Sequence, residues 1–255
     1  MKNSKRLIKI LSVFIILLLI SITSYALYFY LMLNYDEQIS ERLTKDVIVI
    51  NDLFVSMYIV KTDSGYIAID TGFNEAFIEK GLAYNNITTD QIKYVFLTHS
   101  DPDHVNNVHL FNNAEIVFSK KEYEMLEKEG QRFLFIPYYS NKPDLTNFTI
   151  AKEGDKFELA DINVELISLP GHTEGSTGFI IKGKYLFSGD AFRLKNGKIS
   201  IPFKKLFTRD ESAMRETIHI VSQLEGIEYI FTAHSGFTAD FNFATTKTNV
   251  SFTKK

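Results

Sequence analysis

The most constraining feature of this sequence is a stretch of six residues, 99–104, with the sequence HSDPDH. It places two imidazoles and two carboxylates directly after an apolar run over residues 94–97, which predicts a strand that ends at Thr98. Such a strand would deliver all four side chains to one edge of a sheet, where nitrogen and oxygen ligands for a divalent metal ion converge. The alternative is a polar loop between a strand and a helix, with Asp103 near the helix N-cap.

Further candidate ligands follow short apolar runs in the same way. Of the six histidines in the sequence, four occupy such positions, whereas His109 and His219 lie in helix-like stretches and are expected at the surface or partly buried. Because strand ends present their side chains at the edge of a sheet, we expect the candidates to lie close together. The further candidates are His172 after residues 164–169, Asp190 after residues 185–187 and His234 after residues 229–232.

The order of these motifs, His-x-Asp-x-Asp-His, then Gly-His, then Gly-Asp, then His, resembles the metallo-β-lactamase-fold superfamily. Residues 67–72, with the sequence IAIDTG, are also similar to the strand and turn that open that fold. The resemblance covers about residues 46–240 and implies an α/β (α+β) fold, an αββα sandwich with outer helices. That fold hosts lactamases, thioesterases, lactonases, phosphodiesterases and oxidoreductases, so the resemblance does not specify the reaction.

The resemblance implies two metal sites that share one carboxylate. It implies one or two divalent metal ions, with zinc favoured and iron or manganese as alternatives. The first site would consist of His99, Asp101 and His172, and the second of Asp103, His104 and His234, with Asp190 bridging the two.

Asp101 is a departure from the common family motif, His-x-His-x-Asp-His, which has a histidine at this position. The extra carboxylate makes the cluster less positive, which should lower the pKa of bound water less effectively. Sets of two histidines and one carboxylate also suit iron. Because Asp is shorter than His, Asp101 could reach its metal through a water, and a single-metal site is then the alternative.

The implied activity is that of a metallo-hydrolase with a small-molecule substrate. A metal-bound hydroxide would attack an ester, thioester, lactone, lactam or phosphodiester bond. Asp103, besides being a ligand, would be the catalytic residue that orients the hydroxide and accepts a proton. Two alternatives stay open, a non-haem di-iron redox protein and a non-catalytic metal-binding module of the same fold. The sequence does not select a substrate or protein partners.

Composition excludes several other functions. The formal net charge is −3 with acidic and basic residues mixed, which gives no indication of a nucleic-acid partner. The sequence contains no Cys, so no thiolate can act as a metal ligand or nucleophile, and a lipoprotein anchor is excluded.

The N-terminal residues predict a membrane segment. Four basic residues within residues 1–9 precede the uncharged stretch 10–33, whose 24 residues span about 36 Å as a helix, enough for a hydrocarbon core of about 30 Å. We expect a cytoplasmic flank (1–9), a transmembrane signal-anchor helix (10–33), a linker (34–45) and a metallo-β-lactamase-like domain (46–255) on the extracytoplasmic side of the cell membrane. The alternative is a signal peptide cleaved after Ala26, which would give a secreted protein.

Overall fold

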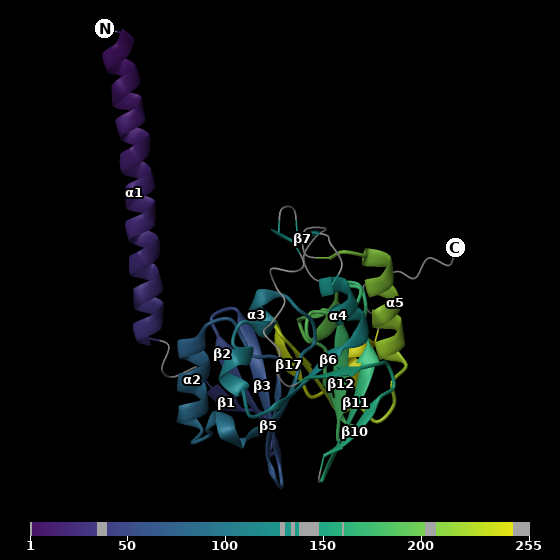
Figure 1. The fold of residues 1–255 in the computed structure, drawn as a ribbon. Helices are drawn as coiled ribbons and strands as arrows, with labels where there is room; N and C mark the ends of the chain where they lie inside the picture. Colours follow the sequence, from purple (N-terminus) through teal and green to yellow (C-terminus); the bar gives the residue numbers. More distant parts are fainter. Residues whose placement is uncertain are drawn as a thin grey trace. The chain divides into compact units, whose positions relative to one another are not determined.

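The structure is a computed structural model, shown in Figure 1, and it describes most of the chain. The described residues are 2–34, 40–127, 131–133, 136–137, 148–159, 161–201 and 208–246. The chain divides into two compact units, Met1–Ile39 and Ser40–Lys255.

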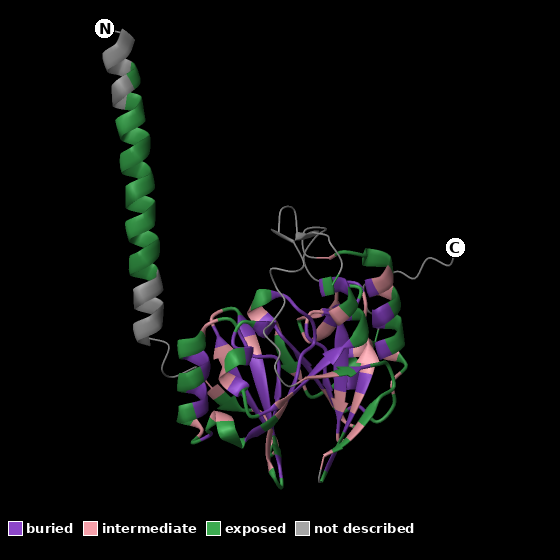
Figure 2. Ribbon diagram, in the orientation of Figure 1, coloured by how far each residue is buried: buried purple, intermediate pink, exposed green. Residues whose placement is uncertain are grey.

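The part of the first unit that the structure describes is one helix, α1 (Lys2–Asn34). Its segment Lys9–Leu27 is apolar and long enough to cross a membrane, and none of it is buried, as the green colour in Figure 2 shows. The helix predicted over residues 10–33 lies within α1, and its segment Lys9–Leu27 is confirmed as an N-terminal, exposed, apolar helix. Helices of this kind occur both in signal anchors and in signal peptides.

The second unit begins with a seven-stranded sheet of order β1-β2-β3-β4-β5-β6-β9. Its first four strands are antiparallel neighbours, and β4, β5, β6 and β9 run parallel. The parallel strands therefore end at the same edge of the sheet. The strands are β1 (Ser40–Arg42), β2 (Val47–Asp52), β3 (Val55–Thr62), β4 (Gly65–Ile69), β5 (Ile92–Phe96), β6 (Glu115–Ser119) and β9 (Phe148–Ala151).

A six-stranded sheet of order β10-β11-β12-β13-β16-β17 forms the other half of this unit. Its neighbours are antiparallel except for the parallel pair β13 and β16. The strands are β10 (Lys156–Leu159), β11 (Ile162–Ser168), β12 (Thr177–Ile181), β13 (Tyr185–Phe187), β16 (Tyr229–Thr232) and β17 (Gly236–Thr238). Two small hairpins pair β7 (Gln131–Phe133) with β8 (Ile136–Pro137), and β14 (Arg193–Lys195) with β15 (Lys198–Ser200).

Helices cover the outer faces of both sheets. The helices are α2 (Glu75–Tyr84), α3 (Pro102–Val105), α4 (Lys120–Glu127), α5 (Glu211–Ser222) and α6 (Phe241–Thr245), with 3-10 turns at Thr89–Gln91 and Val108–Phe111. In Figure 1, α2 lies against the first sheet and α5 against the second. The apolar periodicity of α5 predicts this packing, since its buried residues Met214, Ile218 and Val221 lie on one face.

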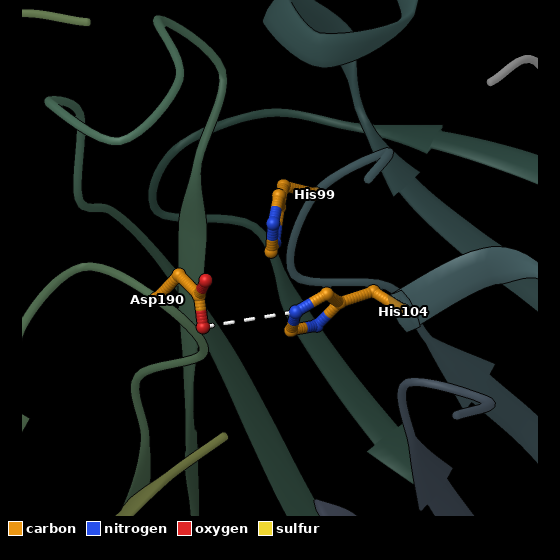
Figure 3. A group of neighbouring side chains, drawn as sticks. All are labelled: His99, His104 and Asp190. Atoms are coloured by element: carbon orange, nitrogen blue, oxygen red, sulfur yellow. Dashed lines mark ion pairs between the residues drawn. The ribbon is translucent and has the colours of Figure 1, made fainter. Parts of the chain in front are cut away.

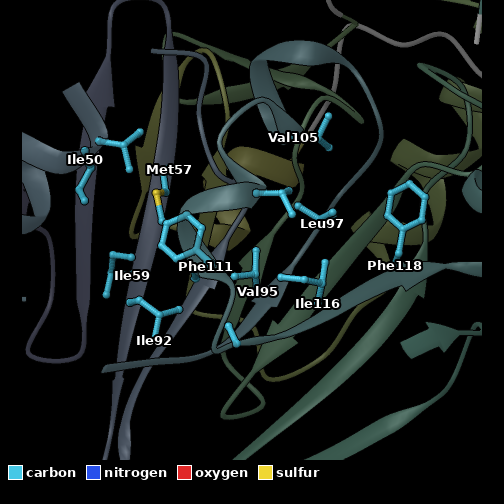
Figure 4. Close-up of a cluster of buried hydrophobic side chains, with 14 of the residues drawn as sticks. Ile50, Met57, Ile59, Ile92, Val95, Leu97, Val105, Phe111, Ile116 and Phe118 are labelled. Atoms are coloured by element: carbon cyan, nitrogen blue, oxygen red, sulfur yellow. The ribbon is translucent and has the colours of Figure 1, made fainter. Parts of the chain in front are cut away.

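The apolar core forms three layers, because both sheets bury apolar side chains on both faces and share the layer between them. In β2, Val47 and Val49 pack between the two sheets, whereas Ile48 and Ile50 pack under the helices. Figure 4 shows the layer under the helices. A third layer lies between the second sheet and the helices α5 and α6. Helix, sheet, sheet and helix follow one another, so the predicted αββα sandwich is confirmed.

Two local predictions need correction. Residues 34–45, predicted as a linker, include β1, whose backbone pairs with β2 and whose Ser40 hydroxyl donates to the carbonyl of Val49. Its polar residues give no apolar pattern, because it is an exposed edge strand. The sequence predicts one helix over residues 105–111, but α3 ends at Val105 and a separate 3-10 turn follows at Val108–Phe111. Pro102 at the first helical position starts α3 early, with Asp101 as N-cap, and Asn106 ends it.

Candidate metal centre

All seven predicted ligands lie just beyond the carboxyl ends of strands. The motif at residues 99–104 follows β5, and the other three ligands follow β11, β13 and β16. β5 belongs to the first sheet and β11, β13 and β16 to the second, and donor atoms from both sheets lie within 4.8 Å of one another, so these ends meet at one edge of the two packed sheets. The loops at this edge therefore bring together side chains that are up to 135 residues apart in the sequence, from His99 to His234.

Three of the side chains form a buried cluster. Oδ2 of Asp101 lies 2.9 Å from Nε2 of His172 and 3.5 Å from Nε2 of His99. All three residues are buried. One donor atom from each lies within 4.8 Å of the others, a spacing that can hold a metal ion.

A second cluster is more open to solvent. Oδ2 of Asp103 lies 3.3 Å from Nε2 of His234 and 3.7 Å from Nε2 of His104. The side chain of His104 is fully buried, whereas that of His234 is 33% exposed. These three donors also lie within 4.8 Å of one another, so a metal at this position would face the solvent.

Asp190 lies between the two clusters. Its Oδ2 is 3.5 Å from Nε2 of His172, and its Oδ1 is 3.2 Å from Nε2 of His234 and 3.7 Å from Nε2 of His104. Figure 3 shows this carboxylate facing the rings of His99 and His104. Each oxygen thus faces a different cluster.

The buried donors in this centre lack the partners that buried polar atoms normally have. Among the residues that the structure describes, Nε2 of His99, Nε2 of His104 and Oδ1 of Asp190 are buried and have no hydrogen-bond partner, although each lies 3.2–3.7 Å from an ionisable group of the clusters. Such atoms are rare in folded proteins because leaving them unpaired is costly. A cation at each cluster would satisfy them, so the donor set fits the metal ions that its residue types indicate.

The side chain of Thr98 indicates that the Nε2 atom of His99 carries no proton. Its hydroxyl donates to Oδ2 of Asp70 at 2.8 Å and lies 3.1 Å from Nδ1 of His99. Because the hydroxyl proton is committed to Asp70, the oxygen can only accept from His99. This assigns the proton of the neutral imidazole to Nδ1 and leaves the lone pair on Nε2, directed into the cluster.

His234 is oriented by a backbone group and borders an aromatic surface. Its Nδ1 lies 2.6 Å from the carbonyl oxygen of Phe54, to which it donates, and the two rings stack with centroids 6.1 Å apart. The ring of Phe54 also lies 5.6 Å from that of Phe73. Both phenylalanines are exposed, so an apolar surface lies beside the open cluster.

In the absence of metal, the carboxylates shift the titration of the histidines. Burial lowers the pKa of His104, but the charges of Asp70, Asp103 and Asp190 outweigh it and raise the pKa to about 9. For His234, burial is likewise outweighed by the charge of Asp190, and the pKa rises to about 11. The neighbouring histidines also hold the pKa of Asp190 far below its usual value, in spite of its burial.

The structure adds two functional candidates that the sequence patterns did not single out, Asp70 and Glu122. Asp70 follows a strand, as the predicted ligands do, so its position in the sequence could have identified it as a candidate. Glu122 lies in the first turn of α4, where an acidic residue is ordinary, so no local signal marks it. His109 is exposed and pairs with Glu75, as expected for a residue outside the centre.

A protein-family model described as the metallo-beta-lactamase superfamily matches residues 50–234 of this chain. The chain belongs to the metallo-β-lactamase superfamily. A probable metallo-hydrolase of Methanocaldococcus jannaschii is 30% identical over 172 residues, which are 67% of this chain and 71% of that protein. Hydroxyacylglutathione hydrolase 1 of Vibrio vulnificus is 29% identical over 152 residues, 59% of this chain and 53% of that protein.

Among solved structures, a metallo-β-lactamase family protein of Thermus thermophilus matches with a TM-score of 0.62 and 18% identity, over 80% of this chain and 78% of that one. This likeness supports the superfamily fold. The chain spans about half the length of the hydroxyacylglutathione hydrolase. The present chain is a metallo-hydrolase of the superfamily. Its histidine and aspartate groups form a metal-binding site typical of the superfamily's di-metal centres.

Proposed function

We propose that this protein is a hydrolase in which two metal ions share Asp190. The observation that carries the proposal is the position of that carboxylate, with one oxygen 3.5 Å from Nε2 of His172 and the other 3.2 Å from Nε2 of His234. One carboxylate can therefore serve both clusters. The proposed ligands are His99, Asp101 and His172 for the first ion, and Asp103, His104 and His234 for the second, with Asp190 common to both.

Asp103 is the residue to which we assign the catalytic role. When bound, divalent ions polarise the bond that is cleaved and lower the pKa of the attacking water. A carboxylate has two oxygens, so Asp103 can bind a metal with one and accept the proton of the water with the other. Its side chain is 20% exposed, compared with 7% for that of Asp101. Water and substrate can therefore reach Asp103.

We propose zinc as the bound ion, because zinc accepts sets of histidine nitrogens and carboxylate oxygens such as those of the two clusters. The carboxylate of Asp101 also makes iron or manganese reasonable occupants. Metal analysis of the protein purified without added metal distinguishes these cases. Zinc or manganese supports hydrolysis, whereas two irons would favour the alternative of a redox protein.

We propose a neutral acyl compound, an ester, thioester or lactone, as the substrate class. Two divalent ions carry four positive charges, and the three carboxylates Asp101, Asp103 and Asp190 leave a net charge of about +1. A histidine at position 101 would leave about +2, so this centre attracts anionic phosphodiesters less strongly. The exposed rings of Phe54 and Phe73 beside His234 provide a surface for an apolar acyl group. The similarity to hydroxyacylglutathione hydrolases favours an acyl bond as the bond that is cleaved.

A panel of chromogenic ester, thioester, lactone, lactam and phosphodiester substrates tests the proposed activity. We expect hydrolysis of acyl substrates by the metal-loaded protein, and a loss of more than about 100-fold in Asp190→Ala together with a loss of bound metal. Asp46→Ala is the matched control, because Asp46 immediately precedes β2, is not among the proposed ligands, and contacts Tyr185 and Lys182. Equal activity and metal content in Asp190→Ala and the wild type would contradict the proposal.

We also propose that residues 10–33 anchor the enzyme in the cell membrane, with the catalytic domain on the extracytoplasmic side. Support comes from the apolar segment Lys9–Leu27 and from the basic residues that precede it. The remaining boundaries follow the sequence prediction, with a cytoplasmic flank over residues 1–9. The domain, predicted from residue 46, is extended by β1 at its start.

Membrane fractionation and protease treatment of intact cells test the location. An anchored enzyme remains in the membrane fraction at full length, and external protease removes its catalytic domain. A soluble protein whose N-terminus is Leu27 would show cleavage after Ala26 and would contradict the anchor. A domain that external protease cannot reach would contradict the extracytoplasmic location.

A further inference from the structure

Glu122 is a fully buried acidic residue that is not among the proposed ligands. It lies in the first turn of α4, which directly follows β6. A buried carboxyl group is stable only when hydrogen bonds satisfy its oxygens. The partners of Glu122 therefore show what the residue does.

The carboxyl group of Glu122 accepts three hydrogen bonds from two different loops. Its Oε1 accepts from the backbone N–H of Ser100 at 2.9 Å and from the Ser100 hydroxyl at 2.6 Å. Its Oε2 accepts from the hydroxyl of Thr173 at 2.7 Å. Ser100 lies between His99 and Asp101, and Thr173 follows His172. The three bonds thus join the two loops that carry the first cluster.

The helix that carries Glu122 is itself fixed to one of these loops. The hydroxyl of Ser119 accepts from the backbone N–H of Glu122 at 3.1 Å and donates to the carbonyl of Gly175 at 2.7 Å. A Cβ atom on Gly175 would overlap the backbone nitrogen of Glu122, so a side chain has no room there. These contacts hold the start of α4, and with it the backbone of Glu122, close against the loop that contains Gly175.

The second cluster is held by different groups. Oδ2 of Asp70 lies 2.8 Å from Nδ1 of His104, and the carbonyl of Phe54 accepts from His234. None of the hydrogen bonds described for Glu122 reaches these residues. Loss of Glu122 should consequently affect one cluster more than the other.

From these contacts we propose that Glu122 is a positioning residue that aligns His99, Asp101 and His172 and selectively strengthens metal binding at the first cluster. The assignment rests on the ligand sets given under Proposed function. Groups that orient metal ligands without touching the metal typically contribute about 10–100-fold to metal affinity. Glu122 differs from such groups in contacting the residues next to the ligands instead of the ligands themselves.

Three variants separate positioning from a general contribution to stability. Glu122→Ala removes all three hydrogen bonds and leaves buried donors unpaired. Glu122→Gln keeps an oxygen for Ser100, and its amide can donate to Thr173, whose hydroxyl can turn toward Ser176 at 2.7 Å. Thr173→Val keeps the shape of the side chain, removes the contacts of its hydroxyl with Glu122 and Ser176, and leaves both bonds from Ser100 to Glu122 in place. It is therefore informative if Glu122→Ala does not fold.

The experiment measures zinc affinity of the full-length protein in detergent by competition with a chromogenic chelator. Two backgrounds isolate the clusters, since His234→Ala disables the second and His172→Ala disables the first. In the His234→Ala background, we expect Glu122→Ala and Thr173→Val to weaken zinc binding by about 10–100-fold, and Glu122→Gln to retain most of the affinity. In the His172→Ala background, we expect no such loss. Asp46→Ala, which removes the contacts to Tyr185 and Lys182, controls for destabilisation.

The outcomes separate this assignment from the proposed function. Equal weakening in both backgrounds, or failure of Glu122→Gln to restore binding, would overturn selective positioning by Glu122. Unchanged zinc affinity of Glu122→Ala and Thr173→Val in the His234→Ala background would overturn it as well. A wild type that binds no zinc would overturn the proposed metal sites, and the assignment would fall with them.

Discussion

Oδ2 of Asp70 lies 2.8 Å from Nδ1 of His104, and both side chains are buried. The carboxylate keeps a proton on Nδ1 and thereby turns Nε2 toward the second cluster. Asp70 also accepts from the backbone N–H of Thr98 at 2.7 Å and from its hydroxyl at 2.8 Å. One carboxylate thus orients a proposed ligand and fixes the residue that precedes His99. Its own backbone has φ of +59°, a conformation that few residues other than glycine adopt readily.

Asp70→Asn should weaken metal binding at the second cluster by about 10–100-fold. In Asn an NH2 group replaces one oxygen and must face either the backbone N–H of Thr98 or the donors of the Thr98 hydroxyl and His104, so the three bonds that the carboxylate accepts cannot all form. Zinc titration in the His172→Ala background measures this cluster alone. Asp46→Asn serves as the control, because Asp46 is also a hydrogen-bonded carboxylate. It immediately precedes β2 and contacts neither cluster. Zinc affinity equal to that of the control would rule out the orienting role.

Gly189→Ala should reduce metal content, because its Cβ would lie 2.5 Å from the Thr98 hydroxyl, which Asp70 holds in place. Relief of this overlap must displace the loop that carries Asp190. Gly183→Ala is a matched control, since Gly183 has φ of +65°, close to the +51° of Gly189, and has no atom within 4 Å of the added Cβ. The control should lose only about 1–2 kcal/mol of stability to backbone strain and keep its metal. Equal metal content in both variants would contradict this account.

Asp101→His should make the centre more positive and lower the pKa of the attacking water. The acidic limb of the pH–rate profile would then move to lower pH, and metal preference would shift toward zinc as the number of nitrogen ligands rises. Metal analysis and pH–rate profiles of both proteins provide the measurement. If metal content and profile both stay as in the wild type, Asp101 is not a ligand.

The metal-free protein should lose stability between about pH 6.5 and pH 9. The folded state raises the pKa of His104 from 6.5 to about 9, so the stabilisation is fully present below 6.5 and disappears as pH rises through 9. His234, whose pKa rises to about 11, extends the loss to higher pH. Thermal unfolding after chelation should therefore give a lower Tm at about pH 9 than at about pH 6. The metal-loaded protein should show a smaller difference, and an equal difference in both forms would contradict the protonation scheme.

Much of the fold was predictable because its strands and long helices bury regular apolar patterns. The strand predicted over residues 229–232 coincides with β16. The exceptions carry no such pattern. Edge strand β1 is polar and forms through backbone pairing, and the break between α3 and the turn at Val108–Phe111 depends on Pro102 and nearby asparagines.

The convergence of the seven candidate side chains was predictable from the sequence, but the residues that orient them were not. The seven proposed ligands are of residue types that bind metals, and their positions after strands mark them in the sequence. The orienting residues form contacts over long sequence distances, such as Glu122 with Thr173, 51 residues apart, and Phe54 with His234, 180 apart. No local pattern reports such a contact, since the packing of the two sheets creates it.

Anomalous diffraction from crystals grown with zinc tests the central claim most directly. We predict two anomalous peaks, one among His99, Asp101 and His172 and the other among Asp103, His104 and His234, with Asp190 in contact with both. The Asp190→Ala variant, crystallised under the same conditions, should lose one or both peaks. An absence of peaks at these clusters, or a single peak that Asp190 does not contact, would contradict the two-metal centre.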